Sequence, residues 1–123
     1  MLIKGQDIRN IKGGEKIANT LKKDCFENQK MRFVIMNPPF GTPWGGKDAP
    51  EGQEKAVKDE YKKGVDGRFG AGLPATTDAQ LLFMQHAVNK LSSDGRAAII
   101  TNGSPLFSGG TTSGESQIRR WLL

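Results

Sequence analysis

Apolar residues gather in two short runs that are separated by a long polar connection. The first run, Phe33-Val34-Ile35-Met36, is continuously apolar rather than alternating. Such a run is typical of a strand that is buried on both faces, as in a parallel sheet. Residues 32–36 are therefore predicted to form a strand. It must end before Pro38 and Pro39, because proline cannot donate to the hydrogen-bond ladder.

Residues 77–91 give the clearest helical pattern. Thr77 and Gln80 occupy the two positions of a capping box, and Asp78 is expected to cap or flank the helix start. Apolar side chains then recur on one face: Leu81, Met84, Val88 and Leu91, with Leu82 beside it. Asp94-Gly95 predicts a turn after this helix.

Residues 96–101 form the second apolar run and are predicted to be a second buried strand. A Gly/Ser/Thr-rich loop covers 102–114, and an amphipathic helix is expected over 116–123. Strand, crossover helix and strand is an α/β pattern with a parallel pair. No internal repeat is found.

The remaining segments give weaker patterns. A short helix over 14–22 is possible, and a loop with a short edge strand is nearly as well supported. The long connection over 41–76 predicts a surface helix within 51–63, where Glu54 with Lys58 and Asp59 with Lys63 have the favourable i,i+4 order.

Composition and charge narrow the class of protein. The chain has 123 residues, 36% of them hydrophobic, which suits one small domain. No apolar run approaches the roughly 20 residues that span a bilayer, and the single Cys25 cannot form an internal disulfide, which fits the cytoplasm. The net charge of +5 allows a nucleic-acid partner. A mildly basic soluble protein is the plain alternative, because the lysines are scattered.

The candidate chemistry lies at the end of the first strand. Asn37 would face the crevice at the carboxyl edge of the sheet, where α/β proteins bind ligands. Pro38 and Pro39 fix the turn, Phe40 adds a flat ring, and Gly41 lets the chain leave without a Cβ. An amide oxygen and a backbone carbonyl beside an aromatic ring suit a planar group that carries an NH2, such as the exocyclic amine of a base. A rigid turn without function is the alternative.

The stretch Asn37-Pro38-Pro39-Phe40 resembles the [N/D]-P-P-[F/Y/W] motif of amino-group DNA methyltransferases. The order of "MRFVIMNPPFG", "DGRFGAG", "DAQLLFMQHAVNKL" and "GRAAIITNGSPLFSGG" is similar to that in the modification subunit of type I restriction–modification systems. The resemblance covers most of residues 31–123. It implies a partial Rossmann-like domain of the class I S-adenosylmethionine-dependent methyltransferases, with an incomplete sheet, an irregular region over 1–31 and the motif-bearing part over 32–123.

The resemblance also implies roles for individual residues. The Asn37 side-chain oxygen and the Pro38 carbonyl would accept hydrogen bonds from the adenine N6 amine. Phe40 would stack on the flipped adenine, and Pro39 and Gly41 would shape the turn that binds it. Asn19 stands where such enzymes carry a short acidic motif, so it is a candidate contact to the cofactor or the target base. No metal site is expected.

The cofactor would be S-adenosylmethionine, which such enzymes hold in a Gly-rich loop after a first strand. That context is missing at three glycine-containing stretches: Gly13-Gly14, Gly70-Ala71-Gly72 and Gly109-Gly110. The partners implied are DNA, a specificity subunit and a restriction subunit, with self-association as a further possibility. The chain is therefore interpreted as a fragment of an adenine-N6 DNA methyltransferase that is inactive alone. A non-catalytic α/β interaction module and one half of a split methyltransferase are the alternatives.

Other residues have plain structural interpretations. Trp44 is expected to pack on the body of the protein rather than contact DNA, and His86 to be a structural histidine, because no partner stands at metal-ligand spacing. Arg68, Arg119 and Arg120 are either solvated charges or phosphate contacts.

Overall fold

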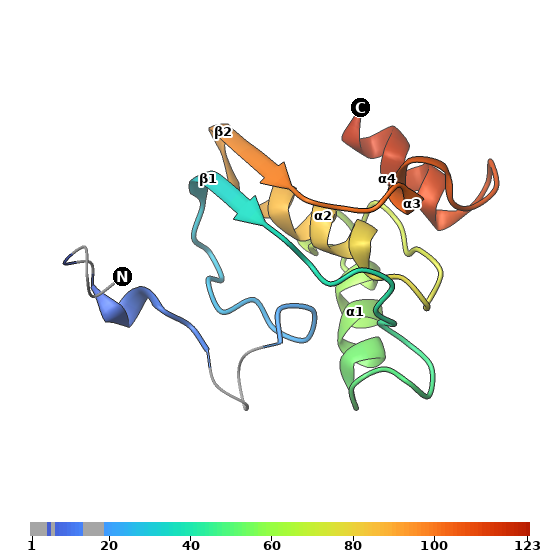
Figure 1. The fold of residues 1–123 in the computed structure, drawn as a ribbon, viewed down its shortest axis with the longest axis horizontal. Coiled ribbons are helices and arrows are strands. Elements are labelled where there is room, and N and C mark those ends of the chain that lie inside the picture. Colours follow the sequence, from blue (N-terminus) through green and yellow to red (C-terminus); the bar gives the residue numbers. More distant parts are fainter. Residues whose placement is uncertain (1–4, 6, 14–18) are drawn as a thin grey trace.

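The computed structural model describes residue 5, residues 7–13 and residues 19–123. Its elements follow in this order: η2 (Ile8–Asn10), β1 (Met31–Met36), α1 (Gln53–Lys62), η3 (Gly64–Asp66), α2 (Gln80–Lys90), β2 (Leu91–Ile99), α3 (Ser104–Phe107) and α4 (Gly114–Leu122). Figure 1 shows the two strands side by side, with α2 behind them and α1, α3 and α4 beyond their carboxyl ends. None of the helices in the described part of the chain is long and apolar enough to cross a bilayer.

The two strands form the predicted parallel pair, and α2 is the crossover helix between them. Phe33 pairs with Arg96 and Met36 with Ile99. The second strand begins earlier than predicted, at Leu91, which pairs with Met31. Asp94-Gly95 is therefore not a turn between elements. It lies in an irregular stretch of β2, where the register shifts so that the strand can hold more residues than its partner.

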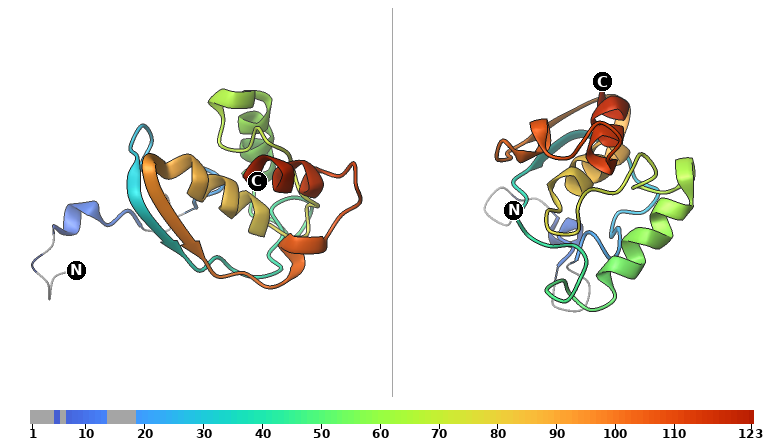
Figure 2. Two further views of the ribbon diagram at one scale, coloured as in Figure 1. Left: turned by 90° about the horizontal axis from the view of Figure 1, so that it is seen from above. Right: turned by 90° about the vertical axis from the view of Figure 1, so that its right-hand side faces the viewer.

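The prediction that β1 is buried on both faces is wrong. The side chains of Phe33 and Ile35 are 66% and 87% exposed, and residues 96–98 of β2 are exposed too. Figure 2 shows α2 against one face of the strand pair, and α2 is the helix that packs on both strands. A continuous apolar run is typical of a strand with two covered faces, but within the described residues only one face of this strand pair is covered.

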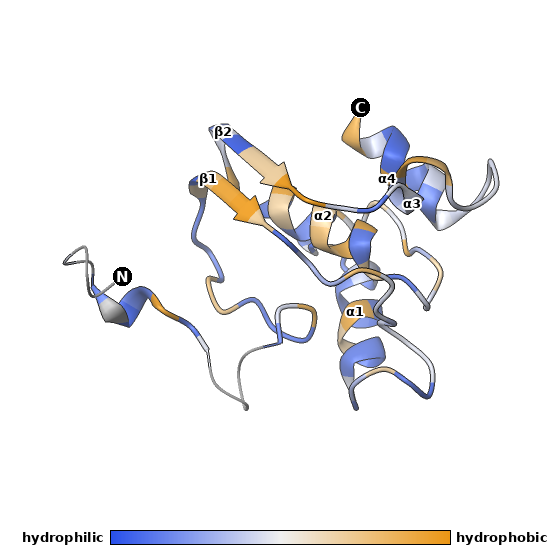
Figure 3. Ribbon diagram, in the orientation of Figure 1, coloured by the Kyte–Doolittle hydropathy of each residue, from blue (hydrophilic) through white to orange (hydrophobic). Residues whose placement is uncertain are grey.

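The hydrophobic core lies beside the sheet, where α1 and α2 meet the loops. It consists of Leu21, Trp44, Val57, Phe69, Ala79 and Leu82, all almost fully buried. Figure 3 shows β1 coloured as hydrophobic while most of α1 is hydrophilic, so α1 contributes mainly Val57 to this core. Trp44 is buried as expected, and its indole N–H donates to the Ala75 carbonyl at 3.0 Å.

The start of α2 differs from the capping-box prediction. The helix begins at Gln80, and Thr77 is exposed. Asp78 flanks the start instead, since its Oδ1 accepts a hydrogen bond from the Gln80 backbone N–H at 3.0 Å. The buried face of α2 also carries polar groups that the apolar pattern did not indicate, among them Gln85 and His86.

The surface helix predicted within 51–63 is confirmed as α1, and Glu54 pairs with Lys58 as predicted. The predicted pair between Asp59 and Lys63 is wrong, because Asp59 binds Lys55 at 2.6 Å. Lys63, the C-cap of α1, acts on Asp59 only through its charge, which helps to lower the pKa of that carboxyl.

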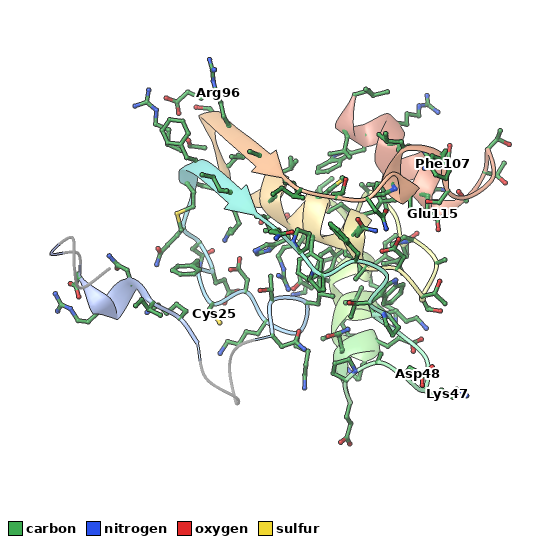
Figure 4. The ribbon with its side chains drawn as sticks, viewed as in Figure 1. Cys25, Lys47, Asp48, Arg96, Phe107 and Glu115 are labelled. Carbon is green, nitrogen blue, oxygen red and sulfur yellow. The ribbon has the colours of Figure 1, made fainter. Side chains whose placement is uncertain are left out.

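The C-terminal helix is confirmed as α4, which starts at Gly114 with Ser113 as its N-cap. The short helix α3 lies inside the stretch that was predicted to be a loop. Figure 4 labels Glu115 at the beginning of α4, and its Oε1 accepts from the Ala75 N–H at 2.6 Å, which ties α4 to the segment before α2. Of the helix considered over 14–22, residues 14–18 lie outside the described residues and residues 20–22 form a turn.

Candidate functional site

Asn37 follows the last residue of β1 at the carboxyl edge of the parallel pair. The Ile100 N–H, just past β2, donates to the Met36 carbonyl at 3.0 Å. The chain segments that leave the two strands therefore start as neighbours, and Figure 1 shows them running side by side away from the sheet. This is the edge at which open α/β sheets bind ligands.

Three of the four residues after β1 are exposed to solvent. Asn37 is exposed, and its side chain makes no hydrogen bond to the described residues. Pro38 is buried, Pro39 is exposed, and the Phe40 ring is 51% exposed. Gly41 has a φ of 60°, the left-handed conformation that glycine adopts most easily. The amide and the ring are thus presented to solvent on a turn whose backbone is fixed by two prolines and this glycine.

The far end of this turn is fixed to the core. The Thr42 carbonyl accepts from the Ala79 N–H at 3.0 Å, and the Trp44 N–H donates to the Thr76 carbonyl at 2.9 Å. Trp44 is 1% exposed. Because both ends of the turn are held by backbone hydrogen bonds and a buried indole, the position of Asn37 is set by the body of the domain.

Asn19 does not lie next to Asn37 in any contact that the structure records, but it is linked to the same turn. Its Oδ1 accepts from the backbone N–H groups of Leu21 and Lys22, and its Nδ2 donates to Gln53 Oε1 at 2.8 Å. Gln53 is buried and donates in turn to the Trp44 carbonyl. Sequence reasoning missed Gln53, because a buried glutamine at the start of a charged surface helix gives no pattern of its own. A contact from Asn19 to a cofactor stays a prediction.

A buried charge network supports the segment that carries Asn19. The Arg68 guanidinium donates to both carboxylate oxygens of Glu60, to the Thr20 carbonyl at 2.6 Å and to the Leu21 carbonyl. Arg68 is thus neither a solvated charge nor a phosphate contact. Burial would raise the pKa of Glu60, but the hydrogen bonds and charge of Arg68 outweigh it and hold that pKa below its usual value.

His86 is part of the same network. Its Nδ1 lies 3.1 Å from Arg68 Nη1, and because a guanidinium can only donate, this nitrogen accepts and the proton is on Nε2. Burial and the neighbouring Arg68 charge lower the pKa of His86 from 6.5 to about 4. The interpretation of His86 as a structural histidine agrees with this geometry. The described residues contain no cluster of His, Cys, Asp and Glu that could hold a metal.

Arg119 also has a structural contact. Its guanidinium donates to the carbonyls of Pro105 and Ser108, and so fixes α3 and the loop after it to α4. Arg120 is exposed. A polar cavity of about 410 Å3 lies between residues 22–30 and Arg68, and the turn at 37–41 does not line it.

The arrangement provides the exposed Asn37 amide and a half-exposed aromatic ring at an open edge, next to the carbonyl of the buried Pro38. It does not provide a cradle for S-adenosylmethionine within the described residues. β1 leads into the proline turn, and β2 leads through a single glycine, Gly103, into the four-residue helix α3, so neither strand is followed by a turn with several glycines that opens a long helix.

Comparison with known proteins gives a consistent picture. A family model described as N-6 DNA Methylase matches residues 1–123. The chain is 31% identical over 111 residues to the type I restriction enzyme EcoKI methylase subunit of Escherichia coli K12 and to the StySJI methylase subunit of Salmonella typhimurium. It is 30% identical to the StySPI methylase subunit of Salmonella potsdam. Each match covers 90% of this chain and 17% of the relative, so the chain spans about a sixth of the length of these curated relatives.

Proposed function

The chain belongs to the N-6 DNA methylase family, and from this premise we propose that it is the target-base part of an adenine-N6 DNA methyltransferase of a type I restriction–modification system. Its 123 residues form part of a Rossmann-like, class I methyltransferase domain, with residues 32–123 carrying the base site. The parallel pair with one crossover helix supports this assignment, since that unit is the building block of such sheets.

The proposed chemistry uses the open acceptors of the turn. An adenine flipped out of the duplex presents two N6 hydrogens, which donate to Asn37 Oδ1 and to the Pro38 carbonyl. The two hydrogen bonds fix the positions of both N6 hydrogens. The lone pair of the nitrogen is then directed out of the plane of the adenine ring, which makes the amine nucleophilic. The Phe40 ring stacks on the base and keeps it out of the helix.

One observation carries this proposal. Asn37 is a polar side chain with no hydrogen bond to the described residues, mounted on a turn that is fixed at both ends. An asparagine that caps a turn often bonds the backbone around it, whereas the exposed amide of Asn37 stays available to a ligand. A preorganised binding site requires a polar group that is available to the ligand and that is held in position by the surrounding backbone.

The cofactor and the partners follow from the family and not from contacts in this chain. S-adenosylmethionine is the proposed methyl donor, and DNA, a specificity subunit and a restriction subunit are the proposed partners. The chain alone is expected to transfer no methyl group, because the described residues form no donor cradle. Labelled methyl transfer to DNA by the purified chain would contradict that expectation.

The test is a chimeric enzyme. The segment of the E. coli methylase subunit that matches this chain is replaced by the chain, the subunit is assembled with its specificity subunit, and transfer of labelled methyl to adenine is measured. Asn37→Ala is expected to lower transfer by about 100-fold or more, the usual effect of losing one preorganised hydrogen bond in the transition state. Asn10→Ala is the matched control, because Asn10 is another exposed asparagine, far from the sheet edge. Equal activity of the two variants would refute the proposal.

A further inference from the structure

Gln80 is completely buried, and its carboxamide is satisfied on both sides. Its Nε2 donates to Asp78 Oδ1 and Oδ2 at 3.1 and 3.0 Å and to Asn102 Oδ1 at 3.0 Å. Its Oε1 accepts from the Asn102 backbone N–H at 3.0 Å. One side chain at the start of α2 therefore binds both the backbone and the side chain of the segment that leaves β2.

Ser104 extends this cluster. Its Oγ donates to Asp78 Oδ2 at 2.8 Å, and its backbone N–H donates to Asn102 Oδ1 at 2.9 Å. Three side-chain hydrogen bonds thus join the segment Asn102–Ser104 to Asp78 and Gln80, although more than twenty residues separate them in sequence. We name Asp78, Gln80, Asn102 and Ser104 the amide brace.

The same start of α2 also holds the proline turn. The Ala79 N–H, between two members of the brace, donates to the Thr42 carbonyl at 3.0 Å. At the sheet, the Ile100 N–H donates to the Met36 carbonyl at 3.0 Å. The two segments that leave the strands are therefore joined where they start, and both are anchored a few residues later to residues 78–80.

We infer that Gln80 is a positioning residue, which fixes the segment Asn102–Ser104 against the turn that carries Asn37 and so sets the shape of the sheet edge. Its effect on methyl transfer rests on the proposed function, but its effect on the position of the two segments does not. Glutamine is the side chain that this place requires, because it must donate to the Asp78 carboxylate and accept from the Asn102 N–H at once. Glutamate would set a second carboxylate beside Asp78, and leucine would leave buried polar groups without partners.

The positional part is tested on the chain itself by amide hydrogen exchange. In Gln80→Leu the Asn102 N–H loses its acceptor, Gln80 Oε1. The N–H groups of Ala79 and Ile100 keep their acceptors, the carbonyls of Thr42 and Met36, and so report on the segment that carries Asn37. All three are expected to exchange about tenfold faster relative to the Val57 amide in α1, the factor for loss of one or two neutral hydrogen bonds. The Val57 reference removes any loss of global stability from the comparison.

Gln85→Leu is the matched control. Gln85 is equally buried in the same helix, but its Nε2 donates to the Gly72 carbonyl, away from the sheet edge. It is expected to leave the relative exchange at Ala79, Ile100 and Asn102 unchanged. Faster exchange at Asn102 alone in Gln80→Leu, or the same change in both variants, would overturn the inference. Should Gln80→Leu not fold, Ser104→Ala gives the same comparison with one bond removed.

The catalytic consequence is measured in the chimeric methylase. Gln80→Leu is expected to lower kcat for methyl transfer at least tenfold, with the KM for S-adenosylmethionine unchanged, because the brace contacts the base side and not the donor side. An unchanged kcat would overturn it. The two proposals fail separately: if Asn37→Ala keeps full activity the base-site proposal fails, while the exchange result stands or falls on its own.

Discussion

Replacing Arg68 with methionine tests how this small chain is held together. The side chains of Arg68 and Glu60 are 5% and 20% exposed, and the guanidinium serves five acceptors: both Glu60 oxygens, the carbonyls of Thr20 and Leu21, and His86 Nδ1. The methionine side chain fills much of the space but donates to none of them. The carboxylate keeps only the hydrogen bond from the backbone N–H of residue 68, and the two carbonyls lose their partner.

The magnitude follows from that geometry. Breaking a buried ion pair by removing one partner costs about 3–5 kcal/mol, because the other charge stays buried without compensation. Glu60 can recover some hydration through its exposed fifth, so the lower end, about 3 kcal/mol, is expected. That is a large share of the roughly 5–15 kcal/mol that holds a domain of this size together.

The measurement is urea unfolding followed by tryptophan fluorescence, with Trp44 as the buried reporter. Arg32→Met is the matched control, since Arg32 also pairs with a carboxylate, that of Asp94, but at 3.7 Å with both side chains about 70% exposed. Such an exposed pair contributes about 0–1 kcal/mol. If the two variants lost the same free energy of unfolding, the reasoning that burial makes the Arg68 pair essential would be refuted.

Three further predictions concern other parts of the chain. Because His86 is neutral in the folded protein, the free energy of unfolding should fall as the pH drops from about 6.5 to about 4. The total fall is on the order of 3 kcal/mol, because only the unfolded chain takes up the proton in that window. Urea titrations of His86→Gln should lack this pH dependence, and a dependence of equal size in the variant would contradict the assignment. Ile35→Lys should change the free energy of unfolding by no more than about 0.5 kcal/mol from that of the unchanged chain, since the side chain is exposed. Sedimentation should show less self-association of the variant. A large loss of stability would mean that this face of the sheet is covered. Gly41→Ala should lower the free energy of unfolding, measured by thermal unfolding, by about 1–2 kcal/mol, because alanine disfavours a φ of 60°. Gly110→Ala is the control, since Gly110 does not have a positive φ, and an equal loss in that variant would contradict this explanation.

Local patterns in the sequence predicted the elements well and their surroundings poorly. The strand before Asn37, the crossover helix and the parallel pairing depend on runs of five to fifteen residues, which periodicity reports directly. The prediction that both faces of β1 are buried is wrong, because the hydrophobicity of a strand does not indicate which other elements of the chain cover it. Phe33 and Ile35 have the composition of a core strand, yet their face is open in this chain.

The polar interior was the least predictable part. Arginine and glutamine usually lie on protein surfaces. Here three such side chains are buried, because hydrogen-bond partners distant in sequence satisfy their polar groups: Arg68, Gln53 and Gln80. No spacing rule joins Gln80 to Asn102 or Arg68 to Thr20. The candidate site itself was visible, because two prolines, an amide and an aromatic ring are adjacent in the sequence, but the residues that hold it in place were not.

The most direct measurement compares Asn37→Asp with Asn37→Ala in the chimeric methylase. If the side-chain oxygen of residue 37 accepts from the adenine amine, aspartate keeps that acceptor and retains a substantial part of the methyl transfer, while alanine abolishes it. Both variants should leave the free energy of unfolding of the chain nearly unchanged, because the Asn37 side chain makes no hydrogen bond to the described residues. Full transfer by the alanine variant, or equal loss in both, would contradict the account.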